Sequence, residues 1–190
     1  MYFAKLNKQF VMPEYTPTVT GGVWAAGRST KNETFEYGDI KKYTFAIWDV
    51  KEQDELGEIV LKVIPERYRG DFVVQCSRAP NGIIPHIDPG RNTSINFYVT
   101  TSNCVTKFFK FKTPADQRAQ WRKSRESLFL KDLEFVESFV AQPGDAYLLD
   151  VSTPHSVVAT KTNSDRTMVC LSSTRTFSEV LEMLKETNSV

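Results

Sequence analysis

The chain has 190 residues, 24 of them basic and 23 acidic, which favours a single domain over 1–190 and disfavours duplex nucleic acid or an anionic membrane as a partner. Three cysteines, Cys76, Cys104 and Cys170, form no CxxC pair, which argues against a disulfide framework or a zinc ribbon. The first residues lack the apolar region of a signal peptide and no apolar run reaches membrane-spanning length, so we expect a cytoplasmic protein.

The first part of the chain is aromatic and turn-rich, with one predicted strand and one predicted helix. Residues 43–50 are rich in β-branched and aromatic side chains, which predicts a strand. A helix over 51–65 is predicted, because apolar residues recur at three- and four-residue spacing before Pro65: Leu56, Ile59, Val60, Val63 and Ile64. We expect this helix and the N-terminal segment to brace a sheet.

From residue 72 the pattern changes to short strands divided by turn residues. Thr113-Pro114 predicts the start of another helix, and a capping box of Thr176 and Glu179 predicts a C-terminal helix over 177–187. We therefore expect a mainly β protein with flanking helices, whose core at about 72–174 is a double-stranded β-helix (jelly roll) of antiparallel strands. The predicted strands of this core cover 72–76, 83–88, 93–100, 105–112, a segment near 133, 146–150 and 166–171.

The chain has two histidines, and both stand in segments that suit a mononuclear iron site. His86 and Asp88 are two residues apart on a predicted strand, so both side chains are expected to project into one cavity. His155 would supply a third ligand from a distant strand. Two imidazoles and one carboxylate on one face of an octahedral Fe(II) leave three positions open. A zinc hydrolase could use the same three residues, but Arg166 would then have no role.

Three segments, 85–88, 143–146 and 153–157, resemble parts of the 2-oxoglutarate- and Fe(II)-dependent oxygenases, most closely the small prolyl-hydroxylase-like group. The resemblance covers about 72–174. It implies that His86, Asp88 and His155 bind Fe(II) and are the catalytic residues, and that Arg166 binds the distal carboxylate of 2-oxoglutarate. The implied reaction hydroxylates an unactivated C–H bond of a small molecule or a prolyl or other peptide side chain. The cosubstrate is decarboxylated to succinate, and ascorbate is a candidate reductant.

Physical chemistry supports the same role for Arg166, because a planar guanidinium matches a carboxylate bidentately. Its structural alternative is pairing with Asp165 or Glu137. Met168 stands where parts of the family have a serine that also binds this carboxylate, so another hydroxyl must help. We expect Tyr98, which shares a strand face with Asn96, to be that group. A half-buried strand tyrosine is the alternative.

Arg91 is placed in a loop at the cavity mouth, as a contact for an anionic substrate or for the 1-carboxylate of the cosubstrate, with a solvated arginine as the alternative. Gln75 and Ser77 line the pocket from the neighbouring strand or serve only in packing. Two other functions also fit the residues. One is a catalytically silent jelly-roll module that binds a sugar or a peptide, and the other is a cupin-type metalloenzyme that does not use 2-oxoglutarate.

Overall fold

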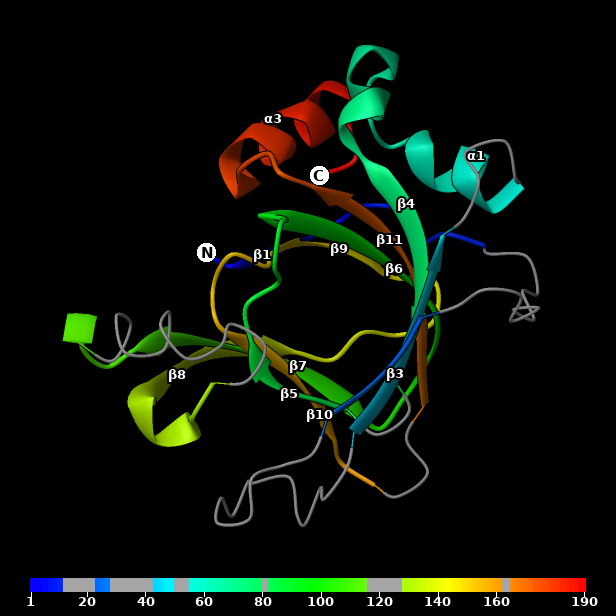
Figure 1. Cartoon of the computed structure of the whole chain (residues 1–190). Coiled ribbons are helices and arrows are strands. Elements are labelled where there is room, and N and C mark those ends of the chain that lie inside the picture. Colours follow the sequence, from blue (N-terminus) through cyan, green and yellow to red (C-terminus); the bar gives the residue numbers. More distant parts are fainter. Residues whose placement is uncertain (12–22, 28–42, 50–54, 80–81, 116–127, 162–164) are drawn as a thin grey trace.

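Two antiparallel sheets form the body of the protein in a computed structural model, which describes residues 1–11, 23–27, 43–49, 55–79, 82–115, 128–161 and 165–190 (Figure 1). The larger sheet has the strand order β1-β9-β6-β11-β4-β3-β2, and the smaller has the order β5-β10-β7-β8. Every described strand pair is antiparallel. The predicted fold class, a mainly β jelly roll with flanking helices, is confirmed.

The larger sheet contains β1 (Phe3–Lys5), β2 (Val23–Gly27), β3 (Tyr43–Asp49), β4 (Val73–Arg78), β6 (Thr93–Ser102), β9 (Ala146–Asp150) and β11 (Asp165–Ser173). The smaller sheet contains β5 (Ile83–His86), β7 (Cys104–Phe111), β8 (Leu133–Phe139) and β10 (His155–Ala159). The described helices are α1 (Glu55–Leu61), α3 (Phe177–Glu186) and the short 3-10 helices η1 (Glu66–Asp71) and η2 (Leu130–Asp132).

The larger sheet separates an apolar core from a polar cavity, because successive side chains of a strand point to opposite faces. On β6, Ile95 and Phe97 belong to the core, whereas Ser94 and Asn96 line the cavity. Helices α1 and α3 lie over the core face (Figure 1). The buried core residues come from both helices, from η1–β4 and from the central strands: Val60, Ile64, Phe72, Val74, Phe97, Leu148, Leu171, Val180 and Leu184 are among them.

An aromatic cluster fills part of the space between the two sheets. Tyr98 of β6 and Phe108 of β7 belong to it, so side chains from both sheets meet there. The rings of Phe139 and Tyr147 stack with their centroids 4.0 Å apart, and Phe3 packs against Phe139 at 4.7 Å. This cluster fixes the spacing of the sheets beside the cavity, since buried aromatic side chains contribute large apolar contact areas.

Two predicted elements are shorter than the sequence suggested. Helix α1 ends at Leu61, and the following residues close a tighter turn in which the amide of Ile64 donates to the carbonyl of Leu61 at 3.1 Å. Pro65 disfavours the α conformation at the residue before it, Ile64, so an α-helix could not have continued to residue 65. Strand β5 ends at His86, so Asp88 lies beyond the strand and not within it.

The C-terminal helix agrees with its predicted capping box. The Thr176 side chain accepts from the amide of Glu179, whose carboxylate accepts from the amide of Thr176. The strand predicted at 146–150 has the observed bounds of β9. Strands β1 and β2 were not predicted. The helix predicted from Thr113-Pro114 is described only at its first residues, and its continuation lies outside the described residues. In the described ranges, none of the helices is both long and apolar enough to cross a membrane.

Candidate metal centre

Pairing between β5 and β10 places the two histidines side by side. His155, the first residue of β10, is the direct partner of His86, the last residue of β5. On its other side His155 pairs with Phe108 of β7. The two imidazole rings have their centroids 4.3 Å apart. Two residues distant in the chain therefore meet because one strand register brings them together.

Each imidazole is oriented by the backbone carbonyl two residues earlier in the chain. His86 Nδ1 lies 2.7 Å from the carbonyl oxygen of Ile84, and His155 Nδ1 lies 2.9 Å from that of Thr153. A carbonyl only accepts, so Nδ1 donates in both rings, and Nε2 is the nitrogen that faces the other two side chains and can bind a metal. A backbone partner at the second ring nitrogen is typical of metal-binding histidines.

Asp88 completes the group from the turn that follows β5. Its amide donates to the carbonyl of Val151 at 3.1 Å, and Gly90, with a φ of +75°, closes the turn behind it. Oδ1 of Asp88 lies 3.2 Å from Nε2 of His86 and 3.9 Å from Nε2 of His155. The three ligand atoms all lie within 4.8 Å of one another. Neighbouring donors around one octahedral ion are about 3 Å apart, so small shifts suffice to bind a metal.

The protonation states also suit a metal. Burial lowers the pKa of His155 to about 4, with a further lowering by His86, so its imidazole is neutral at neutral pH. Burial opposes ionisation of Asp88, but the hydrogen bond from His86 and the nearby basic groups His155 and Arg91 outweigh it and hold the pKa of the carboxyl well below its usual range. Two imidazoles and one carboxylate fit a first-row divalent ion such as Fe(II).

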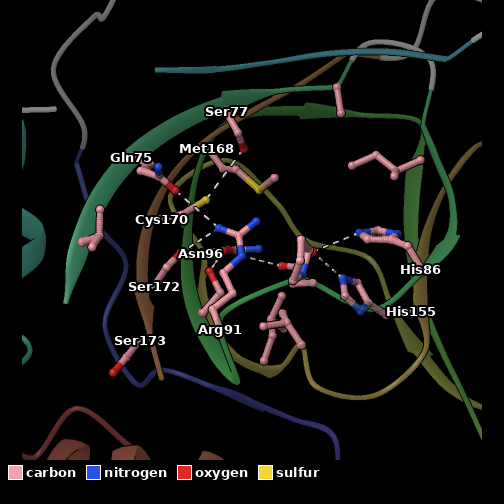
Figure 2. Close-up of a pocket in the computed structure, with 18 of the residues that line it drawn as sticks. Gln75, Ser77, His86, Arg91, Asn96, His155, Met168, Cys170, Ser172 and Ser173 are labelled. Carbon is pink, nitrogen blue, oxygen red and sulfur yellow. Dashed lines mark hydrogen bonds and ion pairs between the residues drawn. The ribbon is translucent and has the colours of Figure 1, made fainter. Parts of the chain in front are cut away.

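Arg91 does not project into solvent. Its Nε lies 2.8 Å from Oδ2 of Asp88, and Nη1 donates to Oγ of Ser172 at 2.9 Å and to Oε1 of Gln75 at 3.4 Å. Figure 2 shows the guanidinium between the two histidines and the wall formed by β4 and β11. We call His86, Asp88 and His155 together the metal-binding group. The alternative of a solvated loop arginine is therefore wrong, and both Gln75 and Ser77 line the cavity.

Arg166, at the start of β11, is a buried cation with only 2% of its surface exposed. Nη1 donates to Oγ1 of Thr106 at 3.1 Å and Nη2 to the hydroxyl of Tyr98 at 3.0 Å, while buried Nε has no hydrogen-bond partner. Among the described residues no carboxylate pairs with it. The alternative partner Glu137 instead accepts from the amide of Tyr2, and the side chain of Asp165 lies outside the described part of the structure.

Tyr98 is fully buried, which excludes the alternative of a half-buried tyrosine at the rim. Burial raises the pKa of its phenol, although Arg166 lowers it, so the hydroxyl is protonated at neutral pH. Asn96 lines the cavity, and its Oδ1 accepts from Oγ of Ser94 at 2.6 Å. The hydrogen bonds of Arg166 go instead to Thr106 and Tyr98.

One cavity of about 650 Å³ contains both the metal-binding group and the guanidinium of Arg166. Hydroxyl and amide side chains of the larger sheet form part of its wall beside apolar residues such as Leu149 and Val157, and Met168 lies where parts of the family have a serine. Sequence reasoning missed Thr106 and Ser172, which hold the two arginines. For Thr106 a signal exists, since it shares a strand face with the buried Phe108. The uncharged polar lining residues from the larger sheet are Gln75, Ser77, Ser94, Asn96, Ser172 and Ser173.

No protein-family model matches the sequence, and no curated protein matches it. Among solved structures, a 2OG-Fe(II) oxygenase family oxidoreductase from Burkholderia pseudomallei is similar, with 12% identity over 69% of each chain and a TM-score of 0.43. Two structures of vicilin from Solanum melongena match with 13% and 12% identity, TM-scores of 0.37 and 0.38, and cover 68% of this chain and 28% of theirs. Likeness at this level carries no functional argument, so the cavity residues have to supply it.

Proposed function

We propose that the chain is a 2-oxoglutarate- and Fe(II)-dependent dioxygenase that hydroxylates an unactivated C–H bond. The observation that carries the proposal is Arg166, a buried cation with no carboxylate partner among the described residues, in the same cavity as three clustered metal-binding side chains. In the overall reaction, 2-oxoglutarate, dioxygen and R–H give succinate, carbon dioxide and R–OH.

An unpaired buried cation is costly, because a charge loses its hydration on burial and regains it only through a partner. A carboxylate from a ligand would supply that partner to Arg166, in the bidentate geometry that guanidinium favours. Tyr98 and Thr106 already hold the guanidinium, and their hydroxyls also stand where they can contact the same carboxylate. They would do the work of the serine that Met168 replaces.

The other cavity residues take separate roles. His86, Asp88 and His155 would hold the iron, which supplies oxygen activation coupled to oxidation of the cosubstrate. Arg166 orients 2-oxoglutarate by its distal carboxylate, and the apolar cluster beside the cavity excludes water from that end. Ascorbate is the candidate reductant. A cytoplasmic location and a small-molecule or peptide substrate stay predictions.

The test measures 2-oxoglutarate binding and succinate formation on one protein preparation. Purified protein with Fe(II), ascorbate and 2-oxoglutarate should form succinate slowly even without a substrate, and His155→Ala should abolish this. Equilibrium dialysis of 2-oxoglutarate against the Mn(II)-loaded protein, without oxygen, gives binding alone. A wild-type protein that neither binds nor consumes 2-oxoglutarate contradicts the proposal.

Two outcomes would instead favour the other functions. Metal-dependent activity that is unchanged in Arg166→Ala would indicate a cupin-type enzyme that does not use 2-oxoglutarate. Protein purified without oxygen and containing no metal, with no uptake of added Fe(II), would indicate a silent binding module. Metal content by mass spectrometry separates the silent binding module from the two metalloenzymes, the proposed dioxygenase and the cupin-type enzyme.

A further inference from the structure

Arg91 lines the same cavity as Arg166, and the proposed binding of 2-oxoglutarate by Arg166 leaves Arg91 without an assigned ligand. Its Nε is engaged by Asp88 and its Nη1 by Ser172 and Gln75. Among the described residues, none accepts a hydrogen bond from Nη2. A quarter of the side chain is exposed, and Figure 2 shows it extending into the cavity. One donor of a fixed guanidinium is therefore presented to the cavity beside the metal-binding group.

The contacts of Arg91 hold the guanidinium in place. A side chain fixed by Asp88 on one side and by Ser172 on the other has already lost most of its rotamer freedom, so a ligand that it binds does not have to order it. Asp88, three residues earlier in the chain, is paired with Nε of the same guanidinium at 2.8 Å. A group bound by Nη2 is therefore held close to the three candidate metal ligands. That is the position in which a reacting C–H bond must be held.

Charge favours an anion at this point. Three arginines and two aspartates line the cavity: Arg78, Arg91, Arg166, Asp71 and Asp88. A divalent ion with dianionic 2-oxoglutarate adds no net charge to this set. One positive charge then stays in excess inside a partly buried space. A substrate with a single negative group would neutralise it, whereas a cationic substrate would add to the repulsion.

The wall opposite the metal-binding group adds hydrogen-bonding capacity. Serine and amide side chains of β4, β6 and β11 line it, among them Ser77 and Ser173. A cavity of about 650 Å³ has the size of a pocket for a small organic ligand. A polar wall of this kind suits a substrate with amino or hydroxyl groups better than a purely apolar one.

We infer that Arg91 binds a carboxylate of the substrate, so that the enzyme acts on a carboxylic acid, either as a free small molecule or as an acidic side chain of a peptide. The inference rests on the proposed dioxygenase function. Arg91 would use Nη2 for the substrate while Nε keeps Asp88 in place. The carboxylate then anchors the substrate next to the iron, with its neighbouring C–H bonds toward the metal.

The experiment compares each acid with its own neutral amide. One arm uses the L-α-amino acids and short hydroxy acids against their carboxamides, and the other uses short peptides with Asp or Glu against the same peptides with Asn or Gln. Binding is measured by equilibrium dialysis on the complex with Mn(II) and 2-oxoglutarate, and turnover by succinate formation with Fe(II). We expect at least one acid to bind about tenfold or more tightly than its amide, the ratio expected from one charge-assisted hydrogen bond.

Variants then assign this preference to Arg91. Arg91→Gln should remove most of the acid-to-amide ratio, and Arg91→Lys should keep part of it. Arg67→Gln is the control, because it removes the same charge from an exposed ion pair with Glu186 outside the cavity, and its ratio should equal that of the wild type. Substitution of Arg91 also removes its ion pair with Asp88 and could lower all activity. The acid-to-amide ratio is insensitive to such a general loss.

The failures are distinguishable. If the protein binds 2-oxoglutarate but no acid in either arm binds or reacts in preference to its amide, the inference is wrong and the proposed function stands. The inference is also wrong, and the proposed function again stands, if the preference for the acid survives in Arg91→Gln or if this variant loses only affinity for 2-oxoglutarate. If the wild-type protein does not bind 2-oxoglutarate, the proposed function fails first.

Discussion

His86 and His155 are direct partners across the β5–β10 ladder, so the register of one short strand pair determines whether both imidazoles reach the same ion. The ladder is irregular between this pair and the next, in which Val157 faces Ile83. Gly82, directly before β5, lies against the backbone of β10 at this irregularity and has a φ of +78°.

Gly82→Ala should disturb the metal-binding group from a distance. A Cβ at Gly82 would lie 2.5 Å from the carbonyl oxygen of Val157, and a positive φ is strained for alanine. We expect a loss of stability of about 1–3 kcal/mol and a weaker affinity for Mn(II). Gly70→Ala is the matched control, since no heavy atom lies within 4 Å of a Cβ there. Urea unfolding with and without Mn(II) measures both effects, and equal behaviour of the two variants would contradict the role of this contact.

Metal binding should stabilise the folded protein. We expect one Mn(II) or Fe(II) per chain and, at about 100 times the dissociation constant, a gain of about 2.7 kcal/mol. Asp88→Ala should lose both the ion and the gain. The control Glu182→Ala removes an exposed carboxylate on α3 and should behave as the wild type. Metal analysis and thermal unfolding with and without EDTA provide the measurement, and an unchanged metal content in Asp88→Ala would exclude this carboxylate as a ligand.

Arg166→Met should separate function from stability. The substitution removes a buried cation that has no carboxylate partner among the described residues, so the free energy of unfolding should be unchanged or raised. Binding of 2-oxoglutarate should weaken by about a hundredfold or more, because a buried charge-assisted contact costs several kcal/mol when one partner is removed. Chemical unfolding and dialysis on the same preparation test both parts. A strongly destabilised variant would instead indicate that Arg166 holds the fold together.

Acid should destabilise the metal-free protein. His155 has a pKa of about 4 in the folded state and about 6.5 when unfolded, so between these values the unfolded chain binds more protons. Its contribution to stability is complete above about pH 6.5 and falls as the pH approaches 4, by on the order of 3 kcal/mol. The lowered pKa of Asp88 acts in the same direction below its usual value of 3.8. Urea unfolding in EDTA across this range checks the slope, and His155→Asn should flatten it.

The sequence predicted the fold class and most core strands because their patterns are local. Alternating side chains and turn residues gave β9 its observed bounds and the capping box gave α3 its start. Strands β1 and β2 were missed, since β1 has only three residues and takes its place from pairing with β9. Neither a short edge strand nor its long-range partner leaves a periodic pattern in the sequence.

The candidate site was predicted in part, but the residues that hold its two arginines in place were not. Residue types and spacing, together with the resemblance to the oxygenase family, selected His86, Asp88, His155 and Arg166. The reason given for Asp88 was wrong, because a turn and not a continuing strand brings it beside His86. The partners of the two arginines depend on which strands are neighbours in space. Thr106 reaches Arg166 from the opposite sheet, which no sequence spacing indicates.

The backbone carbonyls of Ile84 and Thr153 each fix the histidine two residues later. The orientation of each imidazole relative to its own backbone is thus set by a hydrogen bond within three residues and does not depend on a distant side chain. Loops outside residues 84–88 and 153–155 could therefore be lengthened or redesigned for another substrate without changing how either imidazole is held by its own backbone.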